Sequence, residues 1–246
     1  MTLRILSYNI EEGGGNRLDR IAEVIRQAHP DVVALLEAAD RGNAEWLAGA
    51  LNMQLVFGEA NNEQDHVVWL SRLPISRSVN RRHPGLAKTL LEIEVVAGDE
   101  PVTLFATHLG SRWDVPQPAD EIPIILKLME GAAGTPHVLV GDFNALGPDD
   151  PVGQPPGGEP KRGEAIEGAP RPAIRRILAA GYVDCFRMLH PQAPGYTYPS
   201  HHPWLRLDYI FASPELAPHL GACEVVQGTA AATASDHFPM RAEFRW

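Results

Sequence analysis

The sequence predicts an α/β fold, in which a mixed sheet assembly is covered by helices. Two observations indicate this class: apolar strand-like runs alternate along the chain with segments of helical spacing, and short turns join some strands directly. The chain has 246 residues, of which 44% are hydrophobic, so it is long enough to bury a sizeable core. No linker separates two regions of different composition. We therefore expect one domain over residues 1–246.

The predicted strands follow two patterns. Residues 3–10 alternate apolar and polar side chains, whereas residues 31–36 form the continuous apolar run that is typical of a strand buried on both faces. Residues 89–96 and 102–108 are joined by the turn at Gly98-Asp99-Glu100. Further strands are expected at residues 67–71, 137–141, 208–212, 222–227 and 240–245.

Helices are predicted between these strands. Residues 17–28 show helical spacing in Leu18, Ile21 and Ile25, and this helix ends before His29-Pro30 because proline discourages helical continuation. Further helices are expected at residues 44–51, 122–130 and 172–180, the last closed by Gly181, with a short turn or strand at 182–187.

The composition predicts one long loop and indicates where in the cell the protein is expected. Residues 145–172 are rich in proline and glycine and have no periodicity, which is typical of a functional or mobile loop. No apolar run approaches the roughly 20 residues of a membrane span. The start of the chain shows no signal peptide, and two cysteines make no disulfide framework, so we expect a cytoplasmic protein.

Polar residues cluster where the apolar strands end. They are Asn9 and Glu11 after the first strand, Glu37 after residues 31–36, His108 after 102–108, Asp142 and Asn144 after 137–141, Asp208 within the strand near residue 210, and Asp236-His237 before the last strand. Taken singly, Glu37 fits a solvated loop, His108 a satisfied core histidine and Asp142 a turn cap. The recurrence of one residue type at several strand ends argues against a purely structural explanation. Acidic residues with Asn and His suit Mg²⁺ or Mn²⁺ rather than structural zinc.

At these positions the sequence resembles the endonuclease/exonuclease/phosphatase superfamily, which includes DNase I, exonuclease III-like nucleases, neutral sphingomyelinases and inositol polyphosphate 5-phosphatases. The resemblance rests on Ser7-Tyr8-Asn9-Ile10, Leu36-Glu37, Leu70-Ser71-Arg72-Leu73-Pro74-Ile75, Thr107-His108-Leu109, Gly141-Asp142-Phe143-Asn144, Arg206-Leu207-Asp208-Tyr209-Ile210-Phe211 and Ser235-Asp236-His237, in the family's order. It implies a DNase I-like four-layer sandwich, with two mixed sheets face to face and helices outside.

The resemblance also implies roles for the matched residues. Glu37 becomes the principal metal ligand, with Asn9 and Asp236 nearby and Glu11 as a further ligand. Asp142 orients or deprotonates the attacking water, and Asn144 lies beside it. His237, paired with Asp208, contacts the phosphate, and His108 lies near the phosphate or the leaving group. The implied activity is Mg²⁺- or Mn²⁺-dependent hydrolysis of a phosphate ester by direct water attack, without a serine, cysteine or threonine nucleophile.

The motifs narrow the substrate without identifying it. Thr107-His108-Leu109 resembles the DNase, sphingomyelinase and phosphatase branches, and the tyrosine-containing motif of abasic-site endonucleases is absent. No glutamate in residues 59–72 is placed to support His108 in the DNase I manner, although Glu59 and Glu63 lie nearby. We therefore rank a compact phosphodiester or phosphomonoester first, DNA or RNA second and lipid head groups third. A non-catalytic binding module is disfavoured because every matched position is retained, and no protein partner is inferred.

Cations and aromatics beside the motifs are candidates for substrate binding: Arg72, Arg112, Trp113, His202, Trp204 and Arg206. Each has a structural alternative, since the arginines can form ion pairs inside the fold and the tryptophans can pack loops over the sheet edge. The formal net charge of −10 argues against a broad electrostatic grip on long nucleic acid. Part of that charge belongs to the carboxylates of the predicted site itself, so the net charge does not exclude phosphate chemistry. The remaining negative charge favours a compact substrate.

Overall fold

Two six-stranded sheets face each other in the structure, a computed structural model that describes residues 1–98, 100–111, 115–158 and 171–246. The first sheet contains β1 (Thr2–Asn9), β2 (Val32–Leu36), β3 (Gln54–Gly58), β4 (Val67–Ser71), β11 (Leu220–Val225) and β12 (Met240–Arg245), in the order β11-β12-β1-β2-β4-β3. The second contains β5 (Ile75–Arg81), β6 (Leu90–Ala97), β7 (Glu100–His108), β8 (His137–Asp142), β9 (Val183–Asp184) and β10 (Asp208–Ala212), in the order β5-β6-β7-β8-β10-β9.

Each sheet is mixed, because it has one parallel pair among antiparallel neighbours. The parallel pairs are β1–β2 and β7–β8. Each is connected through a helix, as a parallel crossover requires: α1 (Leu18–Ala28) follows β1, and α3 (Pro118–Met129) follows β7. The remaining α-helices are α2 (Arg41–Leu51), α4 (Pro172–Ala179), α5 (Cys185–Leu189) and α6 (Ala231–Ala234). Short 3₁₀ turns occupy Glu12–Arg17, Glu130–Ala132 and Ala217–His219.

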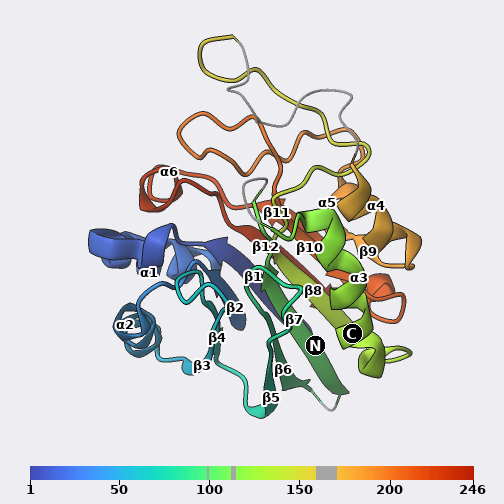
Figure 1. The fold of residues 1–246 in the computed structure, drawn as a ribbon. Helices are drawn as coiled ribbons and strands as arrows, with labels where there is room; N and C mark the ends of the chain where they lie inside the picture. The colour runs from blue at the N-terminus through green and yellow to red at the C-terminus, as the bar shows by residue number, and fades with distance from the viewer. Residues whose placement is uncertain (99, 112–114, 159–170) are drawn as a thin grey trace.

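Three hydrophobic clusters separate four layers. The central cluster lies between the sheets and includes Ile5, Trp69 and Val140. A second joins the outer face of the first sheet to α1, α2 and α6, and a third joins the outer face of the second sheet to α3 and α4. Figure 1 shows α1 and α2 on one flank of the paired sheets and α3 and α4 on the other. The predicted four-layer α/β sandwich is therefore confirmed.

The predicted central strands and long helices are present, and the missed elements lie at the edges. β3 and β5 are edge strands, and the polar pattern of β5, Ile-Ser-Arg-Ser-Val-Asn-Arg, carries no alternating apolar signal. Residues 182–187 divide into β9 and the start of α5, whose N-terminus is capped by the side chain of Asp184. α2 begins at Arg41 rather than at residue 44, because Asp40 accepts a hydrogen bond from the Asn43 amide as an N-cap. The turn expected at Gly98-Asp99-Glu100 includes Asp99, which lies outside the described residues.

Long loops gather at one end of the sandwich. Figure 1 shows the loop that follows β8 beside the loop that precedes β10, above the ends of the central strands. The two loops are joined by hydrogen bonds from Gly153 N to Trp204 O (2.9 Å) and between His202 Nε2 and Gln154 O (3.1 Å). No helix among the described residues is long and apolar enough to cross a membrane.

Strand register brings the predicted site residues to this end. Asn9 pairs with Leu36 across the parallel β1–β2 ladder, so Glu37 follows directly beside it. In the other sheet, Asp142 pairs with both His108 and Asp208. Since the sheets pack face to face, these strand ends lie on the same side of the molecule.

We predict that Gly141→Ala destabilises the protein strongly. Gly141 has φ 153°, and a Cβ there would lie 1.8 Å from the carbonyl oxygen of Thr107 on β7. Gly228 is the matched control, because its φ of 141° is similar but no atom lies within 4 Å of a Cβ. Gly141→Ala should therefore lower the free energy of unfolding by at least about 2 kcal/mol more than Gly228→Ala does, measured by urea denaturation. Equal losses would show that the close approach of β7 and β8 does not require glycine.

Candidate functional site

The side chain of Asn9 links the two sheets at the loop-bearing end. Its Nδ2 donates to Glu37 Oε1 (2.8 Å), which follows β2 in the same sheet, and to Asp142 Oδ2 (3.1 Å) at the end of β8 in the opposite sheet. Its Oδ1 accepts from the Glu11 backbone amide (3.0 Å). Because Asn9 is fully buried and all three bonds are directed, one amide fixes the relative positions of two carboxylates from different sheets.

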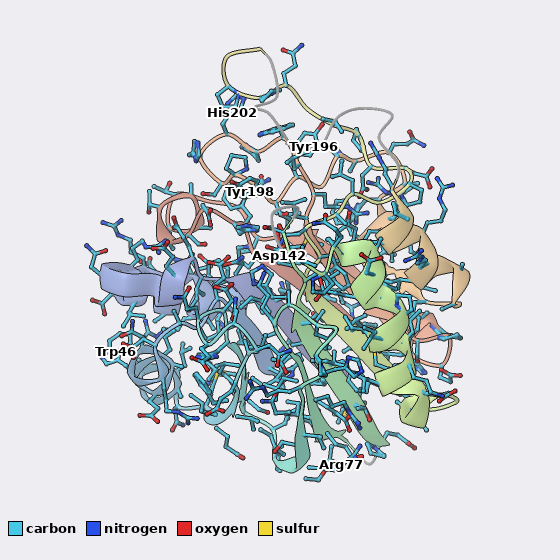
Figure 2. The ribbon with its side chains drawn as sticks, in the orientation of Figure 1. Trp46, Arg77, Asp142, Tyr196, Tyr198 and His202 are labelled. Atoms are coloured by element: carbon cyan, nitrogen blue, oxygen red, sulfur yellow. The ribbon has the colours of Figure 1, made fainter. Side chains whose placement is uncertain are left out.

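Asp142 is a buried carboxylate between two imidazoles. Its Oδ2 lies 3.6 Å from His108 Nε2 and 3.7 Å from His237 Nε2, and its Oδ1 accepts from the Asn144 backbone amide (2.9 Å). Burial raises the pKa of Asp142 to about 7, although the charge of His237 opposes the shift. A carboxylate that titrates near neutral pH is suited to accepting a proton from water. Figure 2 labels Asp142 at the end of the sheets, below the loops that bear Tyr196, Tyr198 and His202.

His237 and Asp208 form a buried ion pair. His237 Nδ1 is 2.8 Å from Asp208 Oδ2, and Asp208 has no solvent-exposed surface. Burial acts to lower the pKa of His237, but Asp208 and then Asp142 outweigh it and raise the pKa to about 10. The ring of Tyr198 packs on the imidazole with centroids 4.8 Å apart. His237 is therefore a positioned cation, with its Nε2 directed toward Asp142.

His108 has the opposite electrostatic character. Burial lowers its pKa well below the ordinary value, and the charges of Lys88 and His237 act in the same direction. Its Nε2 lies 3.1 Å from Asn144 Nδ2. Its Nδ1 is buried and has no hydrogen-bond partner among the described residues, in agreement with the prediction that residues 59–72 supply no supporting glutamate. The site thus contains one cationic and one neutral histidine.

Carboxylates outnumber cations around Asp236. Burial raises the pKa of Asp236, and Glu11, Glu37 and Asp208 raise it further, against the opposing charge of His237. This mutual repulsion fits a bound divalent cation, because oxygen donors of this kind are its preferred ligands. Asp142, Asp208 and His237 also converge within 4.8 Å. A histidine must be neutral to ligate a metal, so the raised pKa of His237 makes the carboxylates of Glu37 and Asp236 the better candidates for metal ligands.

The predicted ligands are not equivalent. Glu37 Oε1 is bonded to Asn9, and its Oε2 accepts from the Glu12 backbone amide (3.1 Å), so the carboxylate is held in place. The carboxylate of Glu11 is instead paired with Arg17, which makes it the weaker candidate. Glu11, Glu37 and Asn144 all have positive φ, of 52°, 56° and 45°. Backbone strain of this kind is typically found at functional sites.

Several predicted substrate-binding residues have structural roles. Arg206 is 1% exposed and pairs with Asp150 and Asp184, so it is an ion-pair partner inside the fold. Arg72 donates to the backbone carbonyl oxygens of Pro30 and Leu51, and these bonds link the loops beside β4. Trp204 is 2% exposed and packs in a small apolar cluster with Leu146, Leu205 and Leu207. The burial of Arg206 and Trp204 corrects the prediction that these two side chains face a substrate. Arg72 is exposed, but it follows the end of β4 that pairs with Val32, at the opposite end of β2 from Glu37.

The remaining residues that were predicted to bind substrate are His202, Arg112 and Trp113. His202 is exposed on the loop between α5 and β10, and its Nε2 contacts Gln154 O. Arg112 and Trp113 lie outside the described residues. His202 therefore stays accessible, although its bond to Gln154 accounts for its orientation.

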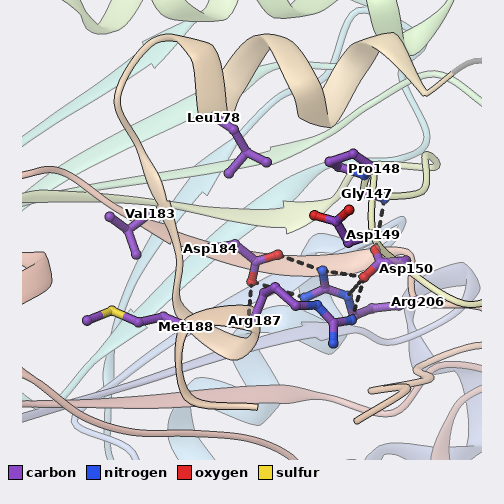
Figure 3. Close-up of a pocket in the computed structure, with 10 residues that line it drawn as sticks. All are labelled: Gly147, Pro148, Asp149, Asp150, Leu178, Val183, Asp184, Arg187, Met188 and Arg206. Atoms are coloured by element: carbon purple, nitrogen blue, oxygen red, sulfur yellow. Dashed lines mark hydrogen bonds and ion pairs between the residues drawn. The ribbon is translucent and has the colours of Figure 1, made fainter. Parts of the chain in front are cut away.

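A separate hollow of about 280 Å³ lies beside the ion pairs of Arg206. Figure 3 shows Asp150 and Asp184 meeting Arg187 and Arg206 on its lining. Tyr209 Oη also donates to Asp150 Oδ2 (2.6 Å), and burial disfavours the charge of Asp150 while Arg206 lowers its pKa. The hollow contains none of the predicted catalytic residues, and the charges of Asp150, Asp184, Arg187 and Arg206 are paired with one another.

Arg171 closes the loop that borders this hollow. Its Nη1 donates to Gly147 O (2.7 Å), 24 residues earlier, and to Asp150 O. Asp150 is in turn held by Arg206, two residues before Asp208. The two ends of the proline- and glycine-rich loop are therefore fixed to each other and to the strand that bears Asp208.

Sequence reasoning missed three residues that shape the site. Tyr198 packs on His237, Lys88 lies near His108, and Ser235 Oγ donates to Asn9 O (2.7 Å) and accepts from the His237 amide (3.2 Å). Ser235 belongs to a matched motif, so its position gave a signal. Tyr198 and Lys88 come from segments without a motif, and their proximity depends on tertiary packing.

Comparison with known proteins agrees with this fold. The sequence model described as the Endonuclease/Exonuclease/phosphatase family matches residues 6–237. Similar solved structures include an AP endonuclease from Archaeoglobus fulgidus (TM-score 0.79, 21% identity, covering 98% of this chain and 99% of that one). They also include an endonuclease/exonuclease/phosphatase from Beutenbergia cavernae (0.73, 24%, 99% and 71%) and D. rerio TDP2 complexed with a single-strand DNA product (0.75, 17%, 100% and 99%). Comparison with curated proteins gives no match.

We predict that His237 stays protonated in the metal-free protein at pH 8, while buried His137 is neutral. Its pKa of about 10 exceeds the unfolded value of about 6.5, so the ion pair stabilises the fold fully below pH 6.5 and loses this effect as the pH rises through 10. Asp208→Asn should lower the pKa of His237 by roughly 1–3 units, measured from ¹⁵N ring shifts. His137, whose pKa is lowered by burial, serves as the internal control. An unchanged His237 titration would contradict the pairing.

Proposed function

Because the chain belongs to the endonuclease/exonuclease/phosphatase family, we propose that it is a divalent-metal-dependent hydrolase of phosphate esters that acts by direct attack of water. The observation that carries the proposal is the position of buried Asp142, between a cationic and a neutral imidazole and beside an excess of carboxylates. This arrangement combines a proton acceptor, a fixed positive charge and oxygen donors within one site.

Each described side chain has a role in that reaction. Asp142 accepts the proton of the attacking water, which its pKa of about 7 allows near neutral pH. His237 stabilises the negative charge that develops on the phosphoryl oxygens, and Asp208 holds its ring in orientation. Asn144, whose backbone amide is bonded to Asp142, contributes an amide beside the same carboxylate.

Glu37, Asp236 and Asn9 would hold the cation, for which their oxygen donors suit Mg²⁺ or Mn²⁺, and Glu11 would be a further ligand only if it left Arg17. When bound, the cation supplies further stabilisation of the charge on the phosphate. Asn9 also holds the carboxylates of Glu37 and Asp142 at a fixed separation through its two hydrogen bonds. The chain itself therefore supplies the orientation of both the proton acceptor and the metal ligands.

A compact phosphodiester or phosphomonoester is the substrate class that we favour. The net charge of −10 disfavours broad contact with a polyanion, and of the cations predicted to bind substrate, Arg206 is engaged inside the fold and Arg72 is bonded to backbone carbonyls. Nuclease activity is the second candidate, because the similar structures include an AP endonuclease and a protein complexed with a single-strand DNA product. Sphingomyelin hydrolysis ranks third.

A substrate panel tests the proposal. The purified protein is incubated with Mg²⁺ or Mn²⁺ and with bis-p-nitrophenyl phosphate, inositol phosphates, plasmid DNA, RNA or sphingomyelin. We expect hydrolysis that chelation by EDTA abolishes and added metal restores. Faster turnover of nucleic acid than of the small esters would favour the nuclease, and hydrolysis of none of them would refute the proposed activity.

We predict that Asp142→Asn lowers kcat by roughly 100- to 10,000-fold, because the amide cannot accept a proton from water. Substrate affinity should change little, and the melting temperature should stay close to that of the parent protein. Asp149→Asn is the matched control, since Asp149 is exposed on the following loop and carries the same charge. Retention of activity by Asp142→Asn would remove it from the role of general base.

We predict that Glu37→Gln weakens metal binding roughly 10-fold or more, because one anionic ligand becomes neutral while its shape is kept. Titration with Mn²⁺, followed by the electron paramagnetic resonance of the free ion, measures this effect without a substrate. Glu45→Gln provides the control, because the Glu45 side chain is 60% exposed on α2 and has the same charge. An unchanged Mn²⁺ affinity would place the cation away from Glu37.

A further inference from the structure

Lys88 is a buried cation that the proposed reaction does not use. It lies just before β6, and the residue is 3% exposed. Its Nζ donates to the carbonyl oxygen of Leu109 (3.0 Å) and lies 3.8 Å from Asp65 Oδ2. Lysine is rarely buried to this extent, because its charge must be removed from water. Its position beside the segment that follows His108 therefore requires an explanation.

The Leu109 carbonyl is shared with the amide of Asn144. Asn144 Nδ2 donates to Leu109 O (3.1 Å) and lies 3.1 Å from His108 Nε2. A carbonyl oxygen only accepts hydrogen bonds, so it fixes which end of the Asn144 amide faces it. With one amide hydrogen on Leu109 O, the second is directed at His108 Nε2. That nitrogen must then offer a lone pair, which makes His108 neutral with its proton on Nδ1.

The charges around His108 are consistent with this protonation state. Burial and the nearby cations Lys88 and His237 lower the pKa of His108. Asp142, 3.6 Å from Nε2, is the facing carboxylate and would favour a proton there. The bond from Asn144 occupies the same nitrogen, so geometry and charge agree on a neutral ring.

A second carboxylate holds Lys88 and Leu109 together. Glu121 on α3 is 1% exposed, and its two oxygens accept from the backbone amides of Ala87 (2.8 Å) and Gly110 (2.7 Å). These residues immediately precede Lys88 and follow Leu109. The distance between the Lys88 ammonium and the Leu109 carbonyl is therefore set by a rigid helix rather than by a free loop.

We propose that Lys88 is a positioning residue that, through the Leu109 carbonyl, fixes the Asn144 amide and keeps His108 as its neutral hydrogen-bond acceptor. The proposal rests on the proposed function and assigns the residues of that same site more closely. It makes His237 the cationic imidazole of the reaction and excludes His108 as a proton donor through Nε2. It also leaves Asn144 Oδ1 as the amide atom available to accept a hydrogen bond from water.

Lys88→Met tests the proposal, with the full-length protein and two measurements. In the parent protein, ¹⁵N ring shifts should show His108 as the neutral Nδ1–H form from pH 6 to 8. In Lys88→Met, removal of the cation should raise the His108 pKa, so that an acidic titration becomes visible. With bis-p-nitrophenyl phosphate and Mg²⁺, kcat should fall about 10-fold, while KM stays within about twofold of the parent value. The pH at which kcat declines on the acidic side of its profile should rise.

Two variants distinguish a positioning role of Lys88 from the general effect of removing one positive charge. Lys88→Arg keeps the charge and should restore most of the activity and the parent His108 titration. Lys127→Met removes the same charge from a side chain that is 73% exposed on α3, and it should leave both measurements unchanged. A His108 that is protonated on Nε2 in the parent protein at pH 7 overturns the proposal, whether or not Lys88→Met folds. So does a Lys88→Met protein with the parent titration and pH profile.

The spectroscopic measurement needs no substrate. If the protein hydrolyses none of the panel but His108 shows the neutral Nδ1–H form and responds to Lys88→Met, the positioning role stands and the proposed function fails. If hydrolysis is observed while His108 is cationic, the function stands and the positioning role fails. The two ideas therefore fail on different observations.

Discussion

Repulsion between carboxylates at one end of the sandwich is the constraint on which the site depends. Asp142 and Asp208 come from the second sheet, and Glu37 and Asp236 come from the first sheet and its connections. Asp142 and Asp208 are buried and Glu37 and Asp236 partly buried, and burial makes a charge more costly and its repulsion from the others stronger. The fold tolerates this arrangement because directed donors meet the carboxylates: the Asn9 amide, the Asn144 backbone amide and the His237 ring.

The opposite states of the two histidines follow from this distribution of charge. His237 lies against two carboxylates and has a raised pKa, whereas His108 lies near a buried lysine and has a lowered pKa. Both rings reach the same oxygen of Asp142 at similar distances. The difference in their chemistry therefore depends first on Asp208, which pairs with Nδ1 of His237, whereas Nδ1 of His108 has no hydrogen-bond partner among the described residues.

Local patterns were sufficient to predict the alternation of strands and helices and the polar residues at the strand ends, whereas the four layers were implied by the family resemblance. The apolar run before Glu37 predicts a buried strand, and a polar residue directly after it must lie at the sheet edge. The roles of Lys88 and Tyr198 could not be predicted in this way, since each reaches its histidine only through tertiary packing. Arg206 shows the same limit: its sequence neighbours indicate a site, but its partners Asp150 and Asp184 are 56 and 22 residues away.

The hydrogen bonds of Arg171 hold the two ends of the proline- and glycine-rich loop together, so the positions of these ends do not depend on the length of the loop. Loop-closure entropy rises only slowly with the number of residues, so lengthening the segment between Asp150 and Arg171 costs little conformational entropy. Because Arg171, Arg206 and Asp150 fix the ends, such a change leaves the strand that carries Asp208 in place. The chain can therefore change in length between Asp150 and Arg171 without moving the strand that carries Asp208.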